Sequence, residues 1–242
     1  MTLSREMKES LRGLISRLGL AKMFVAVRRA RGENVEHLML PSLSDRFAAI
    51  YQNRVWLNGR SSGSLSGRGS ELESTQSIRD RLPALLTSLG TQDLLDVGCG
   101  DFTWLRGVQL PCDYLGLDIV PCVIEQNSRT YGSSRVQFTC CNAVSEHLPP
   151  GDTVLCREVL FHLCFRDGLR LLNNIKQSGA RFLIATNDAE LCSNADILSG
   201  DYRMLNLRRR PFTFPAPILS VPDNYVEPYR VLSVWELANI TV

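Results

Sequence analysis

The stretch LLDVGCGDFTWL, from Leu94 to Leu105, decides the fold class of this chain. Three apolar residues and an acid lead into a glycine-cysteine-glycine turn, which a polar residue and two aromatic residues follow. This order predicts a buried parallel strand that breaks sharply into a helix. Glycines suit such a turn because they let the backbone approach a ligand closely. The carboxylate of Asp96 at the strand end disfavours a phosphate ligand and favours one with positive charge or hydrogen-bond donors.

Length and composition predict one globular catalytic domain with an extension. The chain has 242 residues, of which 44% are hydrophobic and 21% charged, enough to bury a full core. It contains no run of 18 apolar residues, and its start lacks the apolar core of a signal peptide. Eight cysteines form no CxxC pair, and no histidine stands at zinc spacing. We therefore expect a cytoplasmic protein with reduced, mostly buried thiols and no metal.

The charge is concentrated at the N-terminus. Residues 1 to 32 carry +6 and the remainder −4, so a nucleic-acid groove across the catalytic domain is not expected. Apolar residues recur at helical spacing from Leu3 to Leu18 and again as far as Arg31, with a break at Gly19. Residues 1–57 are expected to form a basic amphipathic helical extension. Through residues 1–31 it packs on its own domain or on a second subunit, or lies on an anionic membrane surface.

Residues 33–90 predict two helices and a loop. Ser44 to Asn53 has the pattern of a capped helix. Residues 58–70 contain four glycines and five serines, which predicts a flexible loop at the start of the catalytic domain, residues 58–242. A capping box from Ser70 to Glu73 then opens a helix that Gly90 ends. Pro83 either kinks this helix or starts a second one.

From Asp93 onward, strands alternate with helices, which predicts an α/β fold with a mostly parallel sheet covered on both faces. The last strand follows proline-rich sequence, which favours an antiparallel strand inserted at the sheet edge. The expected helices lie near Thr103, at Val123–Thr130 and at Asp167–Gln177. The expected strands are Asp93–Val97, Asp113–Asp118, Val136–Thr139, Thr153–Arg157, Arg181–Thr186 and Tyr229–Leu237.

Twenty-two residues beyond Asp96, the second strand ends at Asp118. A carboxylate at this place accepts both hydroxyls of a ribose, as acids do in dinucleotide sites. The glycine turn has Phe102 where the GxGxxG pattern would have its third glycine. The prediction of a nucleoside ligand therefore rests largely on Asp118 at the end of the second strand.

The fourth strand reads DTVLCREVLFHL, from Asp152 to Leu163. It resembles the DLVLCRDVLFHL segment of a bacterial group of small class I methyltransferases that use S-adenosylmethionine (SAM). Three further segments are similar: LEST at Leu72–Thr75, GDYRMLNL at Gly200–Leu207 and PFTFPAP at Pro211–Pro217. The resemblance spans residues 50–240. It implies a Rossmann-like fold with a seven-stranded, mostly parallel sheet and an antiparallel edge hairpin strand.

The resemblance also implies SAM as cofactor and S-adenosylhomocysteine (SAH) as product. After the third strand, such enzymes usually present Asp-Ala to the adenine, whereas this chain has Asn142 and Ala143. The Asn142 side-chain oxygen can still accept a hydrogen bond from the adenine. The residues expected to hold the cofactor are Asp96, Gly98, Cys99, Gly100, Phe102, Trp104, Asp118, Ile119, Asn142, Ala143 and Arg157.

Arg157, Glu158 and His162 stand at the carboxyl end of the fourth strand, where open α/β sheets bind ligands. They are the catalytic candidates. His162 is the best base because its ordinary pKa is near neutral, and Glu158 is second. The alternative is a structural His162 with Glu158 paired to Arg157. His37 and His147 have no supporting context and are expected at the surface.

An insertion at residues 200–220 takes the place of a helix and mixes aromatic residues with arginines and prolines. It is expected to form a wall over an anionic or glycan-like acceptor, or else a subunit contact. The candidate substrate-binding residues are Asn187, Asp188, Tyr202, Asn206 and Phe212.

These patterns predict a SAM-dependent methyltransferase that methylates a small molecule or a saccharide, most simply at oxygen. Two alternatives stay open: a non-catalytic SAM- or nucleotide-binding module that docks on a partner or membrane, and a methyltransferase acting on protein or RNA.

Overall fold

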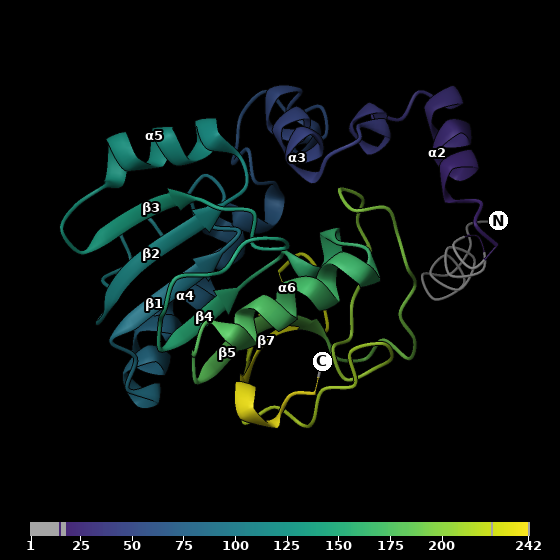
Figure 1. Ribbon diagram of the computed structural model, residues 1–242. Coiled ribbons are helices and arrows are strands. Elements are labelled where there is room, and N and C mark those ends of the chain that lie inside the picture. Colours follow the sequence, from purple (N-terminus) through teal and green to yellow (C-terminus); the bar gives the residue numbers. More distant parts are fainter. Residues whose placement is uncertain (1–14, 16–17, 224, 242) are drawn as a thin grey trace.

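A computed structural model describes residue 15, residues 18–223 and residues 225–241. Its centre is a seven-stranded sheet in the order β3-β2-β1-β4-β5-β7-β6 (Figure 1). The first five strands pair in parallel, and β7 runs antiparallel to both neighbours. The strands are β1 (Asp93–Val97), β2 (Asp113–Asp118), β3 (Val136–Cys140), β4 (Thr153–Cys156), β5 (Phe182–Asp188), β6 (Leu219–Pro222) and β7 (Arg230–Glu236). The predicted α/β fold class is confirmed.

The predicted antiparallel end of the sheet is confirmed, although only one of its two strands was assigned. The predicted last strand corresponds to β7, which lies between β5 and the edge strand β6. The edge strand β6 was not predicted, because its four residues lie in the proline-rich stretch and alternate between half-buried and exposed. Such a short strand has little apolar pattern of its own.

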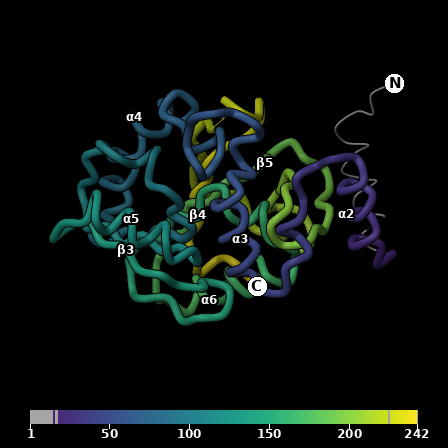
Figure 2. Tube along the Cα trace, turned by 90° about the horizontal axis from the view of Figure 1, so that it is seen from above, coloured from purple at the N-terminus to yellow at the C-terminus, as the bar shows by residue number. Residues whose placement is uncertain are grey.

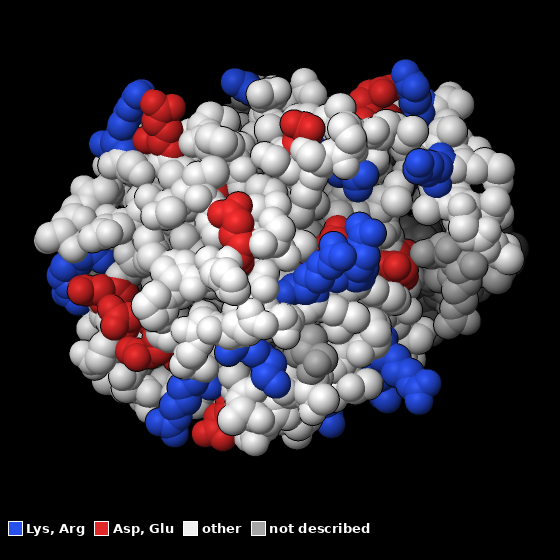
Figure 3. All heavy atoms as spheres, viewed as in Figure 1, with Lys and Arg blue, Asp and Glu red and all other residues white. Residues whose placement is uncertain are grey.

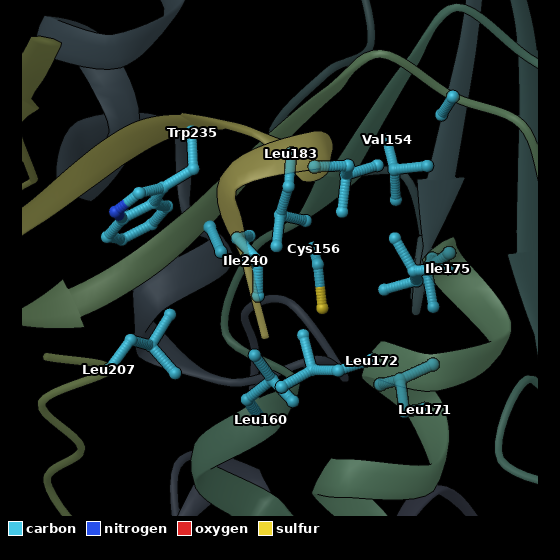
Figure 4. Packing of buried hydrophobic residues seen from close by; sticks show 14 of the residues in the cluster. Val154, Cys156, Leu160, Leu171, Leu172, Ile175, Leu183, Leu207, Trp235 and Ile240 are labelled. Atoms are coloured by element: carbon cyan, nitrogen blue, oxygen red, sulfur yellow. The ribbon is translucent and has the colours of Figure 1, made fainter. Parts of the chain in front are cut away.

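Helices cover both faces of the sheet. On one face α6 (Phe165–Gln177) places Leu171, Leu172 and Ile175 against Val154 and Leu183 of the central strands (Figure 4). On the other face α4 (Leu72–Leu89) packs Ile78, Leu82 and Leu86 against β1, β4 and β5. The helix α5 (Pro121–Tyr131) lies against β2 and β3. Burial on both faces explains the nearly continuous apolar runs of β1, β4 and β5.

The helix predicted near Thr103 does not form. The backbone of Phe102 is left-handed, with φ 58°, and the chain continues as a series of turns to Gly107 at φ 79°. Gly107 and Pro111 leave too few residues for a regular helix before β2 begins. The break after β1 is therefore sharp, as predicted, but it leads into a compact coil.

The start and the course of α4 also differ from prediction. Ser70 belongs to a short 3₁₀ turn, and the N-cap is Glu71, whose side chain makes no capping hydrogen bond. The Ser70–Glu73 capping box is therefore wrong. The helix continues through Pro83, so no second helix starts there, and it ends at Gly90 in the left-handed conformation that was expected.

The N-terminal extension contributes α2 (Ala21–Ala30) and α3 (Leu43–Gln52). Figures 1 and 2 show α3 above the centre of the sheet and α2 to one side. Val25 of α2 packs on Val35 and Leu38, and Leu198 joins this small cluster. The part of the predicted basic helix before Leu18 falls almost entirely outside the described residues. Among the described helices, none is long and apolar enough to cross a membrane.

Candidate active site

A cavity opens at the carboxyl ends of β1, β2 and β4. This is where ligands bind in open α/β sheets. The cavity brings together eleven of the predicted site residues: Gly98, Cys99, Gly100, Trp104, Asp118, Ile119, Asn142, Ala143, Arg157, Glu158 and His162.

The glycine turn forms one wall of this cavity, and its shape requires glycine at two positions. Gly98 and Gly100 have φ of 76° and 58°. A Cβ on Gly98 would collide with the side chain of Val159, and one on Gly100 with the hydroxyl of Ser66. The two glycines thus permit both the left-handed turn and the close packing of neighbouring segments.

Asp118 at the end of β2 faces the turn. Its carboxylate accepts hydrogen bonds from the backbone N–H groups of Gly100 (3.1 Å) and Val120 (3.0 Å). Burial raises the pKa of Asp118 to about 6, although these bonds favour the charged form. Each carboxylate oxygen keeps acceptor capacity for a ligand, because a carboxylate offers about four lone-pair positions.

Asp96 and Phe102 do not line the cavity, contrary to prediction. Asp96 lies behind the turn, where it accepts a hydrogen bond of 2.7 Å from the hydroxyl of Tyr114, and burial raises its pKa to about 7. The ring of Phe102 packs on Tyr114 and Phe138. Both residues therefore support the turn from inside the core. The next strand residue, Val97, does line the cavity, since successive residues of a strand point to opposite faces.

Asn142 and Ala143 line the cavity beyond the end of β3. The Asn142 side-chain oxygen accepts from the backbone N–H of Val144 at 3.2 Å. An amide oxygen has two lone pairs, so one remains for a ligand. The Asn142 oxygen therefore keeps acceptor capacity at the cavity.

Arg157 is buried and engaged by protein groups. It donates to both oxygens of Asp223, each at 3.0 Å, and to the backbone oxygen of Gly69 at 2.8 Å. Its guanidinium lies 5.0 Å from the centre of the Trp104 ring. Because Nε and Nη2 are engaged in this way, Arg157 organises the cavity wall. Sequence reasoning missed Asp223, which follows β6.

Glu158 follows Arg157 in a left-handed conformation, with φ 58°. Its carboxylate accepts from Arg230 of β7 at 3.2 Å, and the Arg157 guanidinium is 3.7 Å away. The predicted Glu158–Arg157 pair exists, but Arg230, which was not predicted, is the nearer partner. Both guanidinium groups therefore engage the Glu158 carboxylate.

His162 presents a neutral imidazole to the cavity. Its Nδ1 lies 2.8 Å from the backbone oxygen of Asp201, and since a carbonyl only accepts, the proton sits on Nδ1. Among the described residues, Nε2 has no hydrogen-bond partner. Burial lowers the pKa of His162 to about 4, so the ring is neutral near pH 7. The ring stacks on Trp56, with centroids 4.9 Å apart.

The roof of the cavity comes from the N-terminal side of the chain, which sequence reasoning did not assign to the site. Leu43, Phe47 and Tyr51 of α3 line the cavity, as does Trp56. The helical pattern of this segment was recognised, but nothing in that pattern showed what it would cover. The extension predicted at residues 1–57 therefore contributes directly to the cavity.

The serine- and glycine-rich segment 58–70 is fastened over the glycine turn by Asp101. The Asp101 carboxylate accepts from the Ser64 hydroxyl (2.8 Å) and from the backbone N–H of Leu65 (2.7 Å). The Ser66 hydroxyl accepts from the Asp101 N–H at 2.9 Å and bonds the Tyr51 hydroxyl at 2.8 Å. A segment of linker-like composition is thus tied to α3 and to the turn at once.

The five predicted substrate-binding residues do not line the cavity. Asn187 accepts from the Leu207 N–H of the insertion, Asn206 donates to the Ala189 oxygen, and Asp188 pairs with Arg230 at 3.0 Å. Phe212 is 1% exposed and packs on Phe165. The insertion fills the core beside α6, because its aromatic residues supply the apolar surface that a helix would have supplied.

Tyr202 comes nearest to the predicted role, since its ring lies 6.0 Å from that of His162. Its hydroxyl accepts from Arg230 and donates to Glu227.

Two further predictions about side chains are corrected. His37 is buried, at 5% exposure, whereas His147 is exposed as expected. The cysteines are free, but Cys122, Cys140 and Cys192 are exposed, so burial holds for fewer of them than predicted. Among the described residues, no group of histidine, cysteine and acidic side chains could hold a metal ion. Figure 3 shows lysines and arginines interspersed with acids on the face it presents.

No family model matches the sequence, and no curated protein matches it. Solved structures do match. Magnesium protoporphyrin IX methyltransferase from Synechocystis with bound SAM is 16% identical, with 81% of this chain and 97% of that one covered and a TM-score of 0.55. N-methyltransferase NodS from Bradyrhizobium japonicum with SAH is 19% identical, with 58% and 74% covered and a TM-score of 0.43. The likeness to the first structure shows that this chain shares its Rossmann-like fold.

Proposed function

We propose that this protein is a SAM-dependent methyltransferase that methylates a hydroxyl oxygen of a small molecule or a saccharide. The observation that carries the proposal is that Asp118, at the glycine turn, and the neutral imidazole of His162 line one cavity. The first is suited to hold a nucleoside and the second to take a proton from an acceptor. The fold shared with a SAM-bound methyltransferase supports the same conclusion.

The side chains present fit this cofactor. The Asp118 carboxylate accepts only backbone N–H groups among its hydrogen bonds in the described part of the chain, so it can accept both ribose hydroxyls as well. Asn142 and Ala143 line the same cavity and would meet the adenine, and the backbone from Gly98 to Gly100 allows close approach. Trp104 and Arg157 complete this side of the cavity.

When bound, SAM would supply a methyl carbon on a sulfonium, which an acceptor oxygen can attack with the thioether of SAH as the leaving group. His162 would take up the hydroxyl proton of the acceptor on Nε2, and the Asp201 carbonyl keeps the ring in the required tautomer. The roof residues from α3 and Trp56 exclude water and hold the acceptor in line. Positioning of this kind contributes about 7–11 kcal/mol in favourable intramolecular models.

The cavity favours an uncharged acceptor over the anionic acceptor that the insertion sequence suggested. Its lining cation, Arg157, is neutralised by Asp223, and Leu43, Phe47, Tyr51 and Trp56 supply a largely aromatic and apolar wall. Removing an anion from water would need an unpaired cation to compensate. A neutral molecule with hydroxyl groups needs no unpaired cation and can pack on this aromatic and apolar wall.

Calorimetry with SAM and SAH tests the first step, and the absence of binding at millimolar ligand in folded protein would contradict the proposal. Methyl transfer is then measured across a panel of neutral hydroxylated acceptors. His162→Gln is expected to lower kcat about 10²- to 10⁴-fold without weakening SAH binding. Binding without transfer to any acceptor would favour the non-catalytic module. Salt-dependent RNA binding that is lost on deletion of residues 1–32 would favour a macromolecular acceptor.

A further inference from the structure

Three consecutive residues where the insertion begins, Ser199 to Asp201, connect His162 to the N-terminal extension. On the active-site side, the Asp201 carbonyl accepts from His162 Nδ1 at 2.8 Å, and the Gly200 N–H donates to the His162 backbone oxygen at 2.7 Å. The Ser199 hydroxyl accepts from the backbone N–H of Cys164 at 2.9 Å. This tripeptide thus contacts both the ring and the backbone of His162.

The opposite side of the same tripeptide is held by the N-terminal extension. Arg46 of α3 donates to the Ser199 backbone oxygen at 2.9 Å, and His37 Nε2 lies 3.2 Å from the Gly200 oxygen. Arg28 of α2 pairs with the Asp201 carboxylate at 2.8 Å, and both side chains are largely buried, at 16% and 13% exposure. Arg28, His37 and Arg46, which belong to three separate elements of the extension, therefore contact the three successive residues Ser199 to Asp201.

The extension also meets the imidazole directly. Trp56, which follows α3, lies against one face of the His162 ring, with an interplanar angle of 29°. The ring is thereby held on one face by stacking and on its Nδ1 edge by the tripeptide. A base must lie within hydrogen-bond reach of the proton that it accepts, so small displacements of such a ring are costly to catalysis.

We infer that Arg28 and Arg46 are positioning residues, through which the N-terminal extension orients His162 for proton transfer. Neither residue lines the cavity, so each acts through Ser199–Asp201. This inference rests on the proposed function for its kinetic consequence, but the orientation of the ring is a property of the folded protein alone. The extension is accordingly a working part of the active site, and removing it would disable catalysis without removing any cofactor ligand.

The test compares the full chain with the Arg28→Met/Arg46→Met double variant and with Arg29→Met. Arg29 pairs with Glu36 at the surface, where both side chains are more than half exposed, and it is the matched control. In the double variant, kcat is expected to fall about 10- to 100-fold while the KM values change less than about three-fold. Arg29→Met should match the wild type in both.

A second readout does not depend on methyl transfer. Long-range ¹H–¹⁵N NMR correlations report the tautomer of each of the three histidines. The wild type and Arg29→Met should show His162 protonated on Nδ1, whereas the double variant should show both tautomers. Its His162 pKa should rise, because the Asp201 charge is then unpaired. The other charged groups facing the ring, Glu158 and Arg230, are unchanged, as is the hydroxyl of Tyr202.

If no acceptor is ever methylated, the proposed function fails and the NMR result alone decides the inference. A double variant with the wild-type tautomer and pKa overturns the inference, whatever its activity. Arg28→Lys keeps the ion pair and should retain the wild-type signature. The single variants Arg28→Met and Arg46→Met give the same comparison if the double variant does not fold, and an unchanged His162 signature in both overturns the inference.

Discussion

The guanidinium of Arg157 donates one hydrogen bond to each carboxylate oxygen of Asp223, both at 3.0 Å, and each side chain is only 3% exposed. This pair joins the end of β4 to the segment between β6 and β7. Through Gly69 and Trp104, Arg157 also touches the loop and the turn on the other side. The closing strands of the sheet are therefore connected to the cavity wall by a buried ion pair.

Removal of the acid from this pair should be strongly destabilising. Asp223→Ala leaves the buried Arg157 charge without its bidentate partner and is expected to cost about 3–5 kcal/mol. Asp113→Ala breaks an ion pair with Arg135 whose side chains are 58% and 59% exposed, and should cost less than about 1 kcal/mol. Urea unfolding of both variants measures the difference. Equal losses would show that Arg157 finds compensation elsewhere.

Nucleoside binding should depend on the protonation state of Asp118. Its pKa is raised to about 6 by burial, so the acid protonates as the pH falls through 6 and then offers fewer acceptor sites to the ribose. The Kd of 5′-methylthioadenosine, which has no amino-acid part, should rise about ten-fold per pH unit well below 6. Asp118→Asn should bind weakly with no such slope. A slope that persists in Asp118→Asn but disappears in Asp96→Asn would assign it to Asp96.

The pH profile of kcat should lack an inflection at the ordinary histidine pKa. Burial lowers the pKa of His162 to about 4, so Nε2 stays available as a base until the pH falls to that value. At saturating substrates, kcat is expected to be level from pH 8 to about 5 and to decrease below. Measurement at saturation separates this effect from the binding effect of Asp118. A decrease centred near the ordinary histidine pKa, about 6.5, would mean that the ring is solvated during turnover.

Alanine substitutions at two glycines with left-handed backbones distinguish the cost of conformational strain from the cost of steric overlap. Gly107, at φ 79°, has open space where a Cβ would lie, whereas a Cβ on Gly100, at φ 58°, would strike the Ser66 hydroxyl and approach Tyr51. Gly107→Ala should therefore cost about 1–2 kcal/mol from strain alone. Gly100→Ala should cost a further 1–3 kcal/mol, roughly, and abolish SAH binding. Thermal unfolding and calorimetry test both, and similar behaviour of the two variants would refute the packing argument.

The hydrogen bonds of Asp101 should hold segment 58–70 in place. Asp101→Ala removes the acceptor for Ser64 and Leu65, and hydrogen exchange of residues 60–70 should become faster as a result. Asp80→Ala, on the surface of α4, serves as the control. Weaker SAH binding should accompany the faster exchange. Unchanged exchange in Asp101→Ala would show that Tyr51 and Ser66 suffice to hold the segment.

The fold could be predicted from the sequence wherever burial left a local pattern. The strands β1 and β2 were predicted with their observed limits, because strands buried on both faces appear as short apolar runs between turns. The prediction of a helix near Thr103 was wrong because the backbone of Phe102 is left-handed, which residue type alone does not reveal. The strand β6 was not predicted because its place depends on pairing with β7.

The site residues likewise divide into those whose position the sequence could predict and those whose position it could not. The position of Asp118, Asn142 and His162 at one cavity could be predicted because parallel strands bring their carboxyl ends to one edge. That Asp96, Phe102 and Phe212 do not line the cavity could not be predicted, because a strand end or an aromatic cluster does not show which side a residue faces. Nor could a local pattern show that Trp56 would lie on His162.

The sequence by itself determined the α/β fold, the glycine turn and the chemical types at the strand ends, since these follow from local periodicity and chain order. Only the tertiary structure decided which charges neutralise one another, which segments cover the cavity and how His162 is oriented. The pairs Arg157–Asp223 and Arg28–Asp201 join residues far apart in the chain. Such pairs arise because folding buries their charges together, and no spacing in the sequence records that proximity.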